Sequence, residues 1–171
     1  FLFVSQGIVM IHQGQEWGHS KVIADSSVED PEIGQIDHDS YNKDNATNHL
    51  NFSEVDLNPG LVSYYRGLIE IRKNAASLRR SEESAIEFQD VEDPLHLAFL
   101  IHGADAGDKY DYFIALNGNN EEINGGSLPG EEPWQVLADL HEAGNQPIRE
   151  IEGDYVLDPT TGMICRRPVE Q

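Results

Sequence analysis

The stretch GIVMIHQGQEWG, residues 7–18, decides how the rest of the chain is interpreted. Its apolar run at residues 8–11 predicts a short buried strand, which ends near Gly14 and releases the chain into a polar, aromatic loop. A continuous apolar run ended by glycine is typical of a strand buried on both faces of a parallel sheet. Ligands of such folds bind where the chain leaves the carboxyl end of a strand. The stretch therefore predicts a site-forming corner; an ordinary buried strand followed by a surface loop is the alternative.

Composition limits the partners of the chain. Its 171 residues, 39% of them apolar, suffice for one domain or for a small domain plus part of another. With 31 acidic and 11 basic residues the formal net charge is −20. Such a field repels nucleic acid and anionic membranes, so neither is expected as a partner. The dispersed acidity and scarce lysine favour a protein adapted to high salt, where charge repulsion is screened, although an ordinary acidic protein has the same signature.

The first residues, FLFV, lack an initiator methionine and the basic start of a signal peptide. We therefore expect a fragment of a longer protein, and leave secretion or a cytoplasmic location open. The single cysteine, Cys165, excludes an internal disulfide.

Residues 14–58 have no clear periodicity and are rich in Asp, Asn, His, Gly and Ser. Loops of this length in compact domains are usually functional or disordered. An ordered loop is favoured here, because apolar residues are available to anchor it: Trp17, Ile23, Ile33, Ile36, Tyr41, Leu50 and Phe52.

A helix is predicted from Asn58-Pro59, with Asn58 as N-cap and Pro59 as its first residue, to Arg72-Lys73. After a connection over residues 75–84 the period changes to two. Strands are predicted at residues 85–88, 95–102, 110–116, 134–138, 155–157 and 163–166, separated by turn clusters. Short strands at this spacing predict an antiparallel β-sandwich, with a domain boundary near Ser81.

Three groups of residues could carry chemistry. Asp37, His38 and Asp39, with His12, His19 and His49, could share a metal ion, but they match no spaced ligand motif. Asp37, Asp39 and Asp44 could bind a calcium ion. We predict neither metal site. Glu16 follows the predicted strand and is expected to hold the loop by accepting backbone hydrogen bonds. Residues 40–52, SYNKDNATNHLNF, combine amides, carboxylates and aromatics, which suits a neutral polyhydroxylated ligand. The aromatics of the strands, Trp134 included, are expected in the core.

These segments resemble the end of the catalytic barrel in the α-amylase superfamily of glycoside hydrolases, closest to the starch-debranching group of type I pullulanases. The likeness lies in SQGIVMIHQGQEWG, DSYNKDNATNHLNF and YYRGLIEIRKNAASLRR, and more weakly in residues 96–120, 134–144 and 156–168, which are similar to the C-terminal β-sandwich of pullulanases. Gly18-His19 stands where relatives usually carry Leu-Arg, and Phe52 where they carry an aromatic, often Trp.

The resemblance implies that residues 1–80 are the last strand, loop and helix of a (β/α)8 barrel and residues 81–171 a C-terminal β-sandwich. The parent would hydrolyse α-glucosidic bonds, chiefly α-1,6 branches, by the retaining two-carboxylate mechanism. Its catalytic carboxylates would lie upstream, so no catalytic residue is assigned here and the fragment alone should be inactive. The resemblance also implies that the partners are an α-glucan and the rest of the barrel. It implies no cofactor, although the parent could bind calcium. The substrate-binding residues that it implies are Glu16, His19, Tyr41, Asn42, Asp44 and Asn48.

Two other hypotheses about the function stay open. A stand-alone carbohydrate-binding module would bind sugar on the sandwich through a row of exposed aromatics. A small metal-dependent hydrolase would use the His12, Asp37, His38 and Asp39 set.

Overall fold

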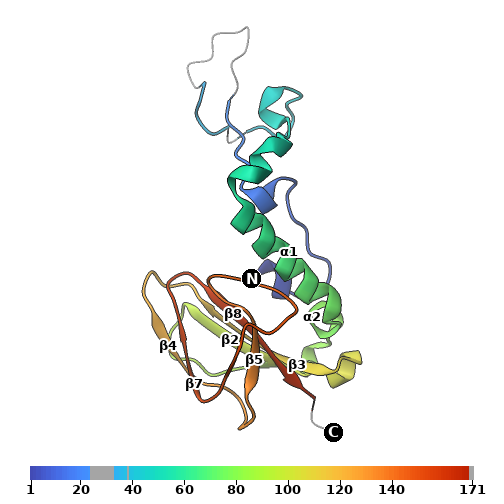
Figure 1. Cartoon of the computed structure of the whole chain (residues 1–171), viewed down its shortest axis with the longest axis vertical. Coiled ribbons are helices and arrows are strands. Elements are labelled where there is room, and N and C mark those ends of the chain that lie inside the picture. Colours follow the sequence, from blue (N-terminus) through green and yellow to red (C-terminus); the bar gives the residue numbers. More distant parts are fainter. Residues whose placement is uncertain (24–32, 38, 170–171) are drawn as a thin grey trace. The chain divides into compact units, whose positions relative to one another are not determined.

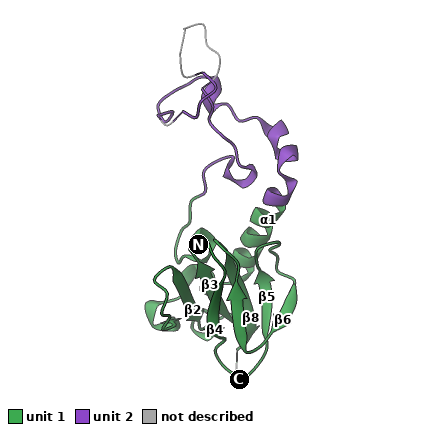
Figure 2. Ribbon diagram, turned by 90° about the vertical axis from the view of Figure 1, so that its left-hand side faces the viewer, with its two compact units in different colours: residues 1–10, 63–171 green, residues 11–62 purple. Residues whose placement is uncertain are grey.

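The computed structural model describes residues 1–23, 33–37 and 39–169, and the chain divides into two compact units. Unit 1 consists of residues 1–10 and 63–171, and unit 2 of residues 11–62 (Figure 2). The predicted domain boundary between residues 80 and 81 falls inside unit 1 and stays a prediction. Among the described residues, no helix has the length and apolar character needed to cross a bilayer.

Unit 1 is built on a six-stranded antiparallel sheet in the order β1-β2-β3-β8-β5-β6, beside a two-stranded sheet of β4 and β7 (Figure 1). The strands are β1 Ile86–Phe88, β2 His96–Ile101, β3 Tyr110–Asn117, β4 Ile123–Ser127, β5 Trp134–Ala138, β6 Arg149–Ile151, β7 Asp154–Leu157 and β8 Gly162–Pro168. All neighbouring strands pair antiparallel, which confirms the antiparallel pairing predicted for the second half of the chain.

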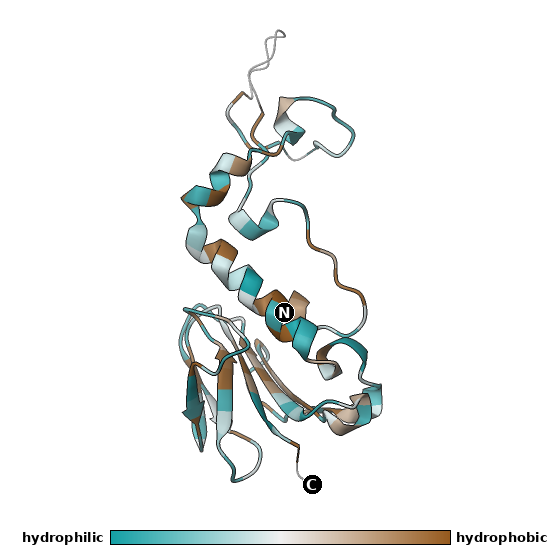
Figure 3. Cartoon of the chain, turned by 45° about the vertical axis from the view of Figure 1, so that its right-hand side comes forward, coloured by the Kyte–Doolittle hydropathy of each residue, from teal (hydrophilic) through white to brown (hydrophobic). Residues whose placement is uncertain are grey.

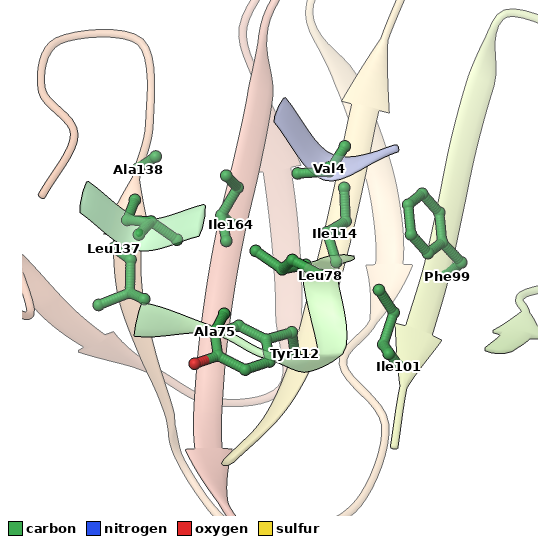
Figure 4. Close-up of a cluster of buried hydrophobic side chains, with 11 residues drawn as sticks. Val4, Ala75, Leu78, Phe99, Ile101, Tyr112, Ile114, Leu137, Ala138 and Ile164 are labelled. Carbon is green, nitrogen blue, oxygen red and sulfur yellow. The ribbon is translucent and has the colours of Figure 1, made fainter. Parts of the chain in front are cut away.

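Apolar side chains pack on both faces of the large sheet, in two separate clusters. Along β3, Tyr112 and Ile114 face one cluster, whereas Phe113 and Ala115 face the other. The first cluster packs against Val4, Ala75 and Leu78 and is drawn in Figure 4; the second is closed by side chains of β7 and by Trp134. Period-two alternation therefore separates two cores instead of a core and a solvent face.

The helices are α1 Pro59–Asn74 and α2 Ser77–Arg80, with short 3-10 turns at Leu2–Val4, Gln15–Trp17, Ala46–Asn48, Phe52–Leu57, Glu83–Ala85 and Ala104–Ala106. The predicted helix is confirmed from Pro59 onward. Asn58 lies at its start, and its carbonyl accepts the N–H of Val62, but its side-chain amide donates to the Trp17 carbonyl at 2.8 Å. Asn58 thus fixes the preceding loop in addition to starting the helix.

Several predicted elements differ in the structure. Residues 8–11 form no strand, and Ile8 and Met10 are 102% and 85% exposed. A strand requires neighbours for its backbone groups, and among the described residues this segment has none. Strands β4 and β6 and helix α2 were not predicted, because Gly125-Gly126 is typical of a turn and the other two elements are only three or four residues long.

Arg72 holds the start of the chain in unit 1. Its guanidinium is buried and donates to four backbone carbonyls: Phe3, Ser5 and Leu78 at 2.8 Å, and Gly7 at 2.6 Å. Burial, together with the nearby Arg79, lowers its pKa. The sequence predicts only that the helix ends near Arg72-Lys73. It does not reveal this contact set, because three of the four partners lie 65 to 69 residues away.

His96 gives unit 1 a pH-dependent stability. Its ring is buried, with Nε2 3.1 Å from the Tyr155 hydroxyl, and burial lowers its pKa although Asp93 opposes the shift. The unfolded chain binds a proton near pH 6.5 while the folded chain resists it. The free energy of unfolding should therefore fall as the pH drops below about 6.5, by at most about 1.4 kcal/mol per pH unit for this group.

The measurement is urea unfolding of the wild type and His96→Gln between pH 7.5 and pH 5. The glutamine keeps a partner for Tyr155 without titrating, so this variant should lose less stability over the range. Exposed His141, replaced by Gln, is the control and should retain the wild-type slope. Parallel curves for the wild type and His96→Gln would contradict the prediction.

Candidate functional site

All six predicted substrate-binding residues lie in unit 2, on a loop that forms 3-10 turns and a bridge between Val22 and Ile36. Residues 24–32 and 38, which include His38 of the metal reading, lie outside the described residues. Of the predicted anchors, Trp17 is buried, whereas Ile33, Ile36, Tyr41 and Phe52 are exposed in the structure. The loop is thus held by polar contacts more than by the apolar anchors expected. Figure 3 shows that hydrophilic and hydrophobic residues are mixed along it.

Glu16 lies on a tight turn that begins and ends with glycine, and His19 directly follows it. Gly14 and Gly18 both adopt the left-handed conformation, with φ of 89° and 73°. A Cβ on Gly14 would lie 2.7 Å from the Cβ of His19, so the turn has no room for a side chain there. The chain thus turns at Gly14, although the strand predicted to end there is not formed.

Trp17 anchors this turn. Its ring is 4% exposed and packs against Phe52 with ring centroids 5.5 Å apart. Its carbonyl accepts from Asn58, while its indole Nε1 is buried without a hydrogen-bond partner among the described residues. An indole N–H buried in this way is a donor available to a bound group.

His19 is oriented by Glu54, a residue that the sequence did not single out. Its Nδ1 lies 3.0 Å from Oε2 of Glu54, and its side chain is 6% exposed. The other ring nitrogen, Nε2, is buried and has no partner within the described ranges; the same holds for Oε2 of Glu16. With the proton on Nδ1, Nε2 is a fixed acceptor for a hydroxyl group.

The expected backbone hydrogen bonds to Glu16 are absent from the described part of the chain. Its carboxylate is therefore not the clamp predicted for this loop, and its buried oxygen remains free to accept a hydrogen bond.

The other four predicted residues belong to a second turn, at residues 39–49. Asn48 closes it by donating to the carbonyls of Ser40, at 2.7 Å, and Lys43. Tyr41, Asn42 and Asp44 are exposed on this turn, and Tyr41 is 85% exposed. Oδ1 of Asn48 is buried without a partner in the described structure. Asn48 thus orders the turn that presents the other three side chains.

Asp37, which was considered as a metal ligand, has other partners in the structure. Asp37 is buried, with Oδ2 2.6 Å from Nζ of Lys43, and Oδ1 accepts the N–H of Asp39. Within the described ranges, no three His, Cys, Asp or Glu side chains gather as a metal site would require. The ion pair could not be read from the sequence, because Asp37 and Lys43 share no periodic pattern.

Most aromatic side chains of the strands lie in the core, as predicted, whereas Phe88 of β1 is 66% exposed. Trp134 is fully buried; its Nε1 donates to the Pro129 carbonyl at 3.0 Å, and Arg167 lies over its ring. Phe113 and Tyr155 pack around the same cluster. The row of exposed aromatics required by a sugar-binding sandwich is thus not formed by these residues.

No protein-family model matches the sequence. Solved structures do match it. The pullulanase from Bacillus acidopullulyticus aligns with a TM-score of 0.79 and 16% identity, over 97% of this chain and 19% of that one. The pullulanase of Group B Streptococcus aligns with a TM-score of 0.77 and 21% identity, over 97% of this chain and 27% of that one. The type I pullulanase from Bacillus subtilis, solved with maltose, aligns with a TM-score of 0.72 and 20% identity, over 98% of this chain and 22% of that one.

The chain spans less than a third of the length of these enzymes, and at these identities the likeness establishes the fold. The resemblance predicted chiefly from residues 5–18, 39–52 and 64–80 is confirmed at that level: this chain has the fold of one part of these pullulanases.

Proposed function

We propose that this chain is part of a retaining glycoside hydrolase that cleaves α-1,6 branches in α-glucans. The observation that carries the proposal is the match of at least 97% of the chain to pullulanase structures. In this proposal, residues 1–80 complete a (β/α)8 barrel and residues 81–171 form the domain behind it. The extended, exposed segment around Ile8 and Met10 suits a strand whose sheet neighbours are supplied by the parent protein.

The chemistry would belong to carboxylates elsewhere in the parent, and the loop of unit 2 would bind the substrate. Glu16, His19 and Asn48 each contribute a buried polar atom without a partner among the described residues, and Tyr41, Asn42 and Asp44 are exposed on the second turn. Oriented donors and acceptors of this kind can pair with the hydroxyl groups of a glucan. The maltose complex of the Bacillus subtilis enzyme supports the same ligand class.

The first test compares the chain with its parent. The purified chain should release no reducing ends from pullulan, either at low salt or in about 2 M KCl, where the Debye length is only about 3 Å or less. The parent, captured from source cells with an antibody against this chain, should hydrolyse pullulan, and its mass should far exceed 19.1 kDa, since a whole barrel takes about 250 residues. Turnover by the isolated chain, or a captured parent that is inactive on pullulan, would overturn the proposal.

The second test addresses the loop. In the parent, His19→Ala should raise KM for pullulan by about 5- to 100-fold with a smaller effect on kcat, because a hydroxyl partner is lost from the bound substrate. Exposed His49, replaced by Ala, lies on the same loop and should leave KM unchanged. Equal KM values for both variants would remove His19 from the binding site.

A further inference from the structure

We propose that unit 1 contains a binding site for a small oxyanion, of the phosphate type, in the pocket between the end of α1 and the strands β3 and β8. The pocket has a volume of about 450 Å³. Its polar lining includes Asn74, Asp108, Lys109, Tyr112, Asn145 and Arg166. It is separate from the loop of unit 2, so this proposal does not depend on the proposed hydrolase function.

Arg166 is the centre of the site because its guanidinium is held in place without a carboxylate. Its Nε donates to Gln135 at 3.1 Å, its NH1 lies 3.5 Å from the Asn145 side-chain oxygen, and its Cζ lies 4.3 Å from the centroid of the Tyr110 ring. In a chain of net charge −20, none of the ion pairs within the described residues involves Arg166. A fixed guanidinium with unused N–H groups is the side chain best suited to bind a phosphate or carboxylate.

Tyr112 supplies a second donor. The residue is 2% exposed, with its ring in the first core cluster and its phenol oxygen at the edge of that cluster (Figure 4), and it lines the pocket. No hydrogen bond of this hydroxyl is formed within the described residues. Burial and nearby Asp108 raise its pKa, so it remains a protonated donor at neutral pH. The hydroxyl is not one of the fully buried atoms that lack a partner, so it is accessible from the pocket and can donate to a bound acceptor.

The remaining groups favour an anion over a sugar. Asp108 would repel an anion, but its oxygens already accept from the N–H and hydroxyl of Ser77 and from the N–H of Lys109, which disperses its charge. The side chain of Lys109 is exposed at the pocket and adds a positive charge. Tyr110 could have stacked on a sugar, yet one ring face is covered by Arg166 and its ring packs against the core. The pocket therefore offers several donors and no open aromatic face.

The test is calorimetric titration of the purified chain with inorganic phosphate at about 0.15 M ionic strength, where the Debye length is about 8 Å. Binding in the millimolar range is expected. Arg166→Gln should weaken it at least about tenfold, and Tyr112→Phe, which preserves the core packing, about threefold, as the loss of one charge-assisted and one neutral hydrogen bond predicts. Arg80→Gln is the control: Arg80 is exposed outside the pocket and should leave binding unchanged.

One further ligand, a phosphomonoester, distinguishes the source of the anion. A phosphomonoester that binds tighter than inorganic phosphate would identify an organic phosphate as the natural ligand, and equal affinity would identify the free ion. No heat with phosphate up to about 50 mM, equal binding by Arg166→Gln, or binding of maltotetraose at this pocket in place of phosphate would each overturn the proposal. If Arg166→Gln does not fold, Tyr112→Phe and Arg166→Lys decide the question. Lysine keeps the positive charge but lacks the planar pair of N–H donors of the guanidinium.

Discussion

Replacing Arg72 by Met should lower the free energy of unfolding by about 3–5 kcal/mol, because the buried guanidinium bonds carbonyls that would lose their donor. The four acceptors lie on two separate segments, residues 3–7 and residue 78. Methionine fills similar space and offers no donor. Lysine keeps the charge but has no planar fork, so Arg72→Lys should retain only part of the stability.

Urea unfolding followed by circular dichroism measures the total loss. Hydrogen exchange of the Gly7 amide, which donates to the Arg79 carbonyl at 3.1 Å, reports whether the N-terminal segment detaches first. The matched control is Arg80→Met, since Arg80 is exposed. A loss below about 0.5 kcal/mol in Arg72→Met, within the range of ordinary surface changes, would mean that water replaces the guanidinium at no cost.

The elements that could be predicted are those whose signal is local. Strand β5 has its predicted bounds, and α1 begins at Pro59 as predicted, since helix periodicity and a proline at the first turn need no distant partner. Strand β4 was missed for a non-local reason. A Cβ at Gly125 would lie 1.9 Å from the Tyr155 ring, so glycine is required there by packing and not by a turn.

The same distinction explains the site. The composition of residues 14–58 predicted one ordered polar loop, and in the structure the described part of this loop contains 3-10 turns. The orientation of His19 depends on Glu54, 35 residues later, and the contacts of Arg72 span up to 69 residues. The predicted strand at residues 8–11 has the correct composition for burial, but composition does not supply its sheet neighbours.

Gly67→Ala should be the other strongly destabilising change. Gly67 is buried in α1, and a Cβ there would lie 1.8 Å from the carbonyl oxygen of Ala143, in the connection between β5 and β6. That atom belongs to the backbone, so no rotamer change can relieve the overlap and the helix or the connection must move. Overpacking of this kind costs about 1–3 kcal/mol, which exceeds the roughly 1 kcal/mol that alanine gains over glycine inside a helix.

The control is Gly60→Ala on the same helix, where an added Cβ meets nothing within 4 Å. It should leave the melting temperature unchanged or raise it, whereas Gly67→Ala should lower it by several degrees, at about 2–4 °C per kcal/mol for a chain of this size. Thermal unfolding of the two variants side by side separates the close contact from helix propensity. If both alanines shift the melting temperature equally, α1 does not depend on its close approach to Ala143. If Gly67→Ala alone is destabilised, the absence of a side chain at this position is what allows α1 to pack against the connection.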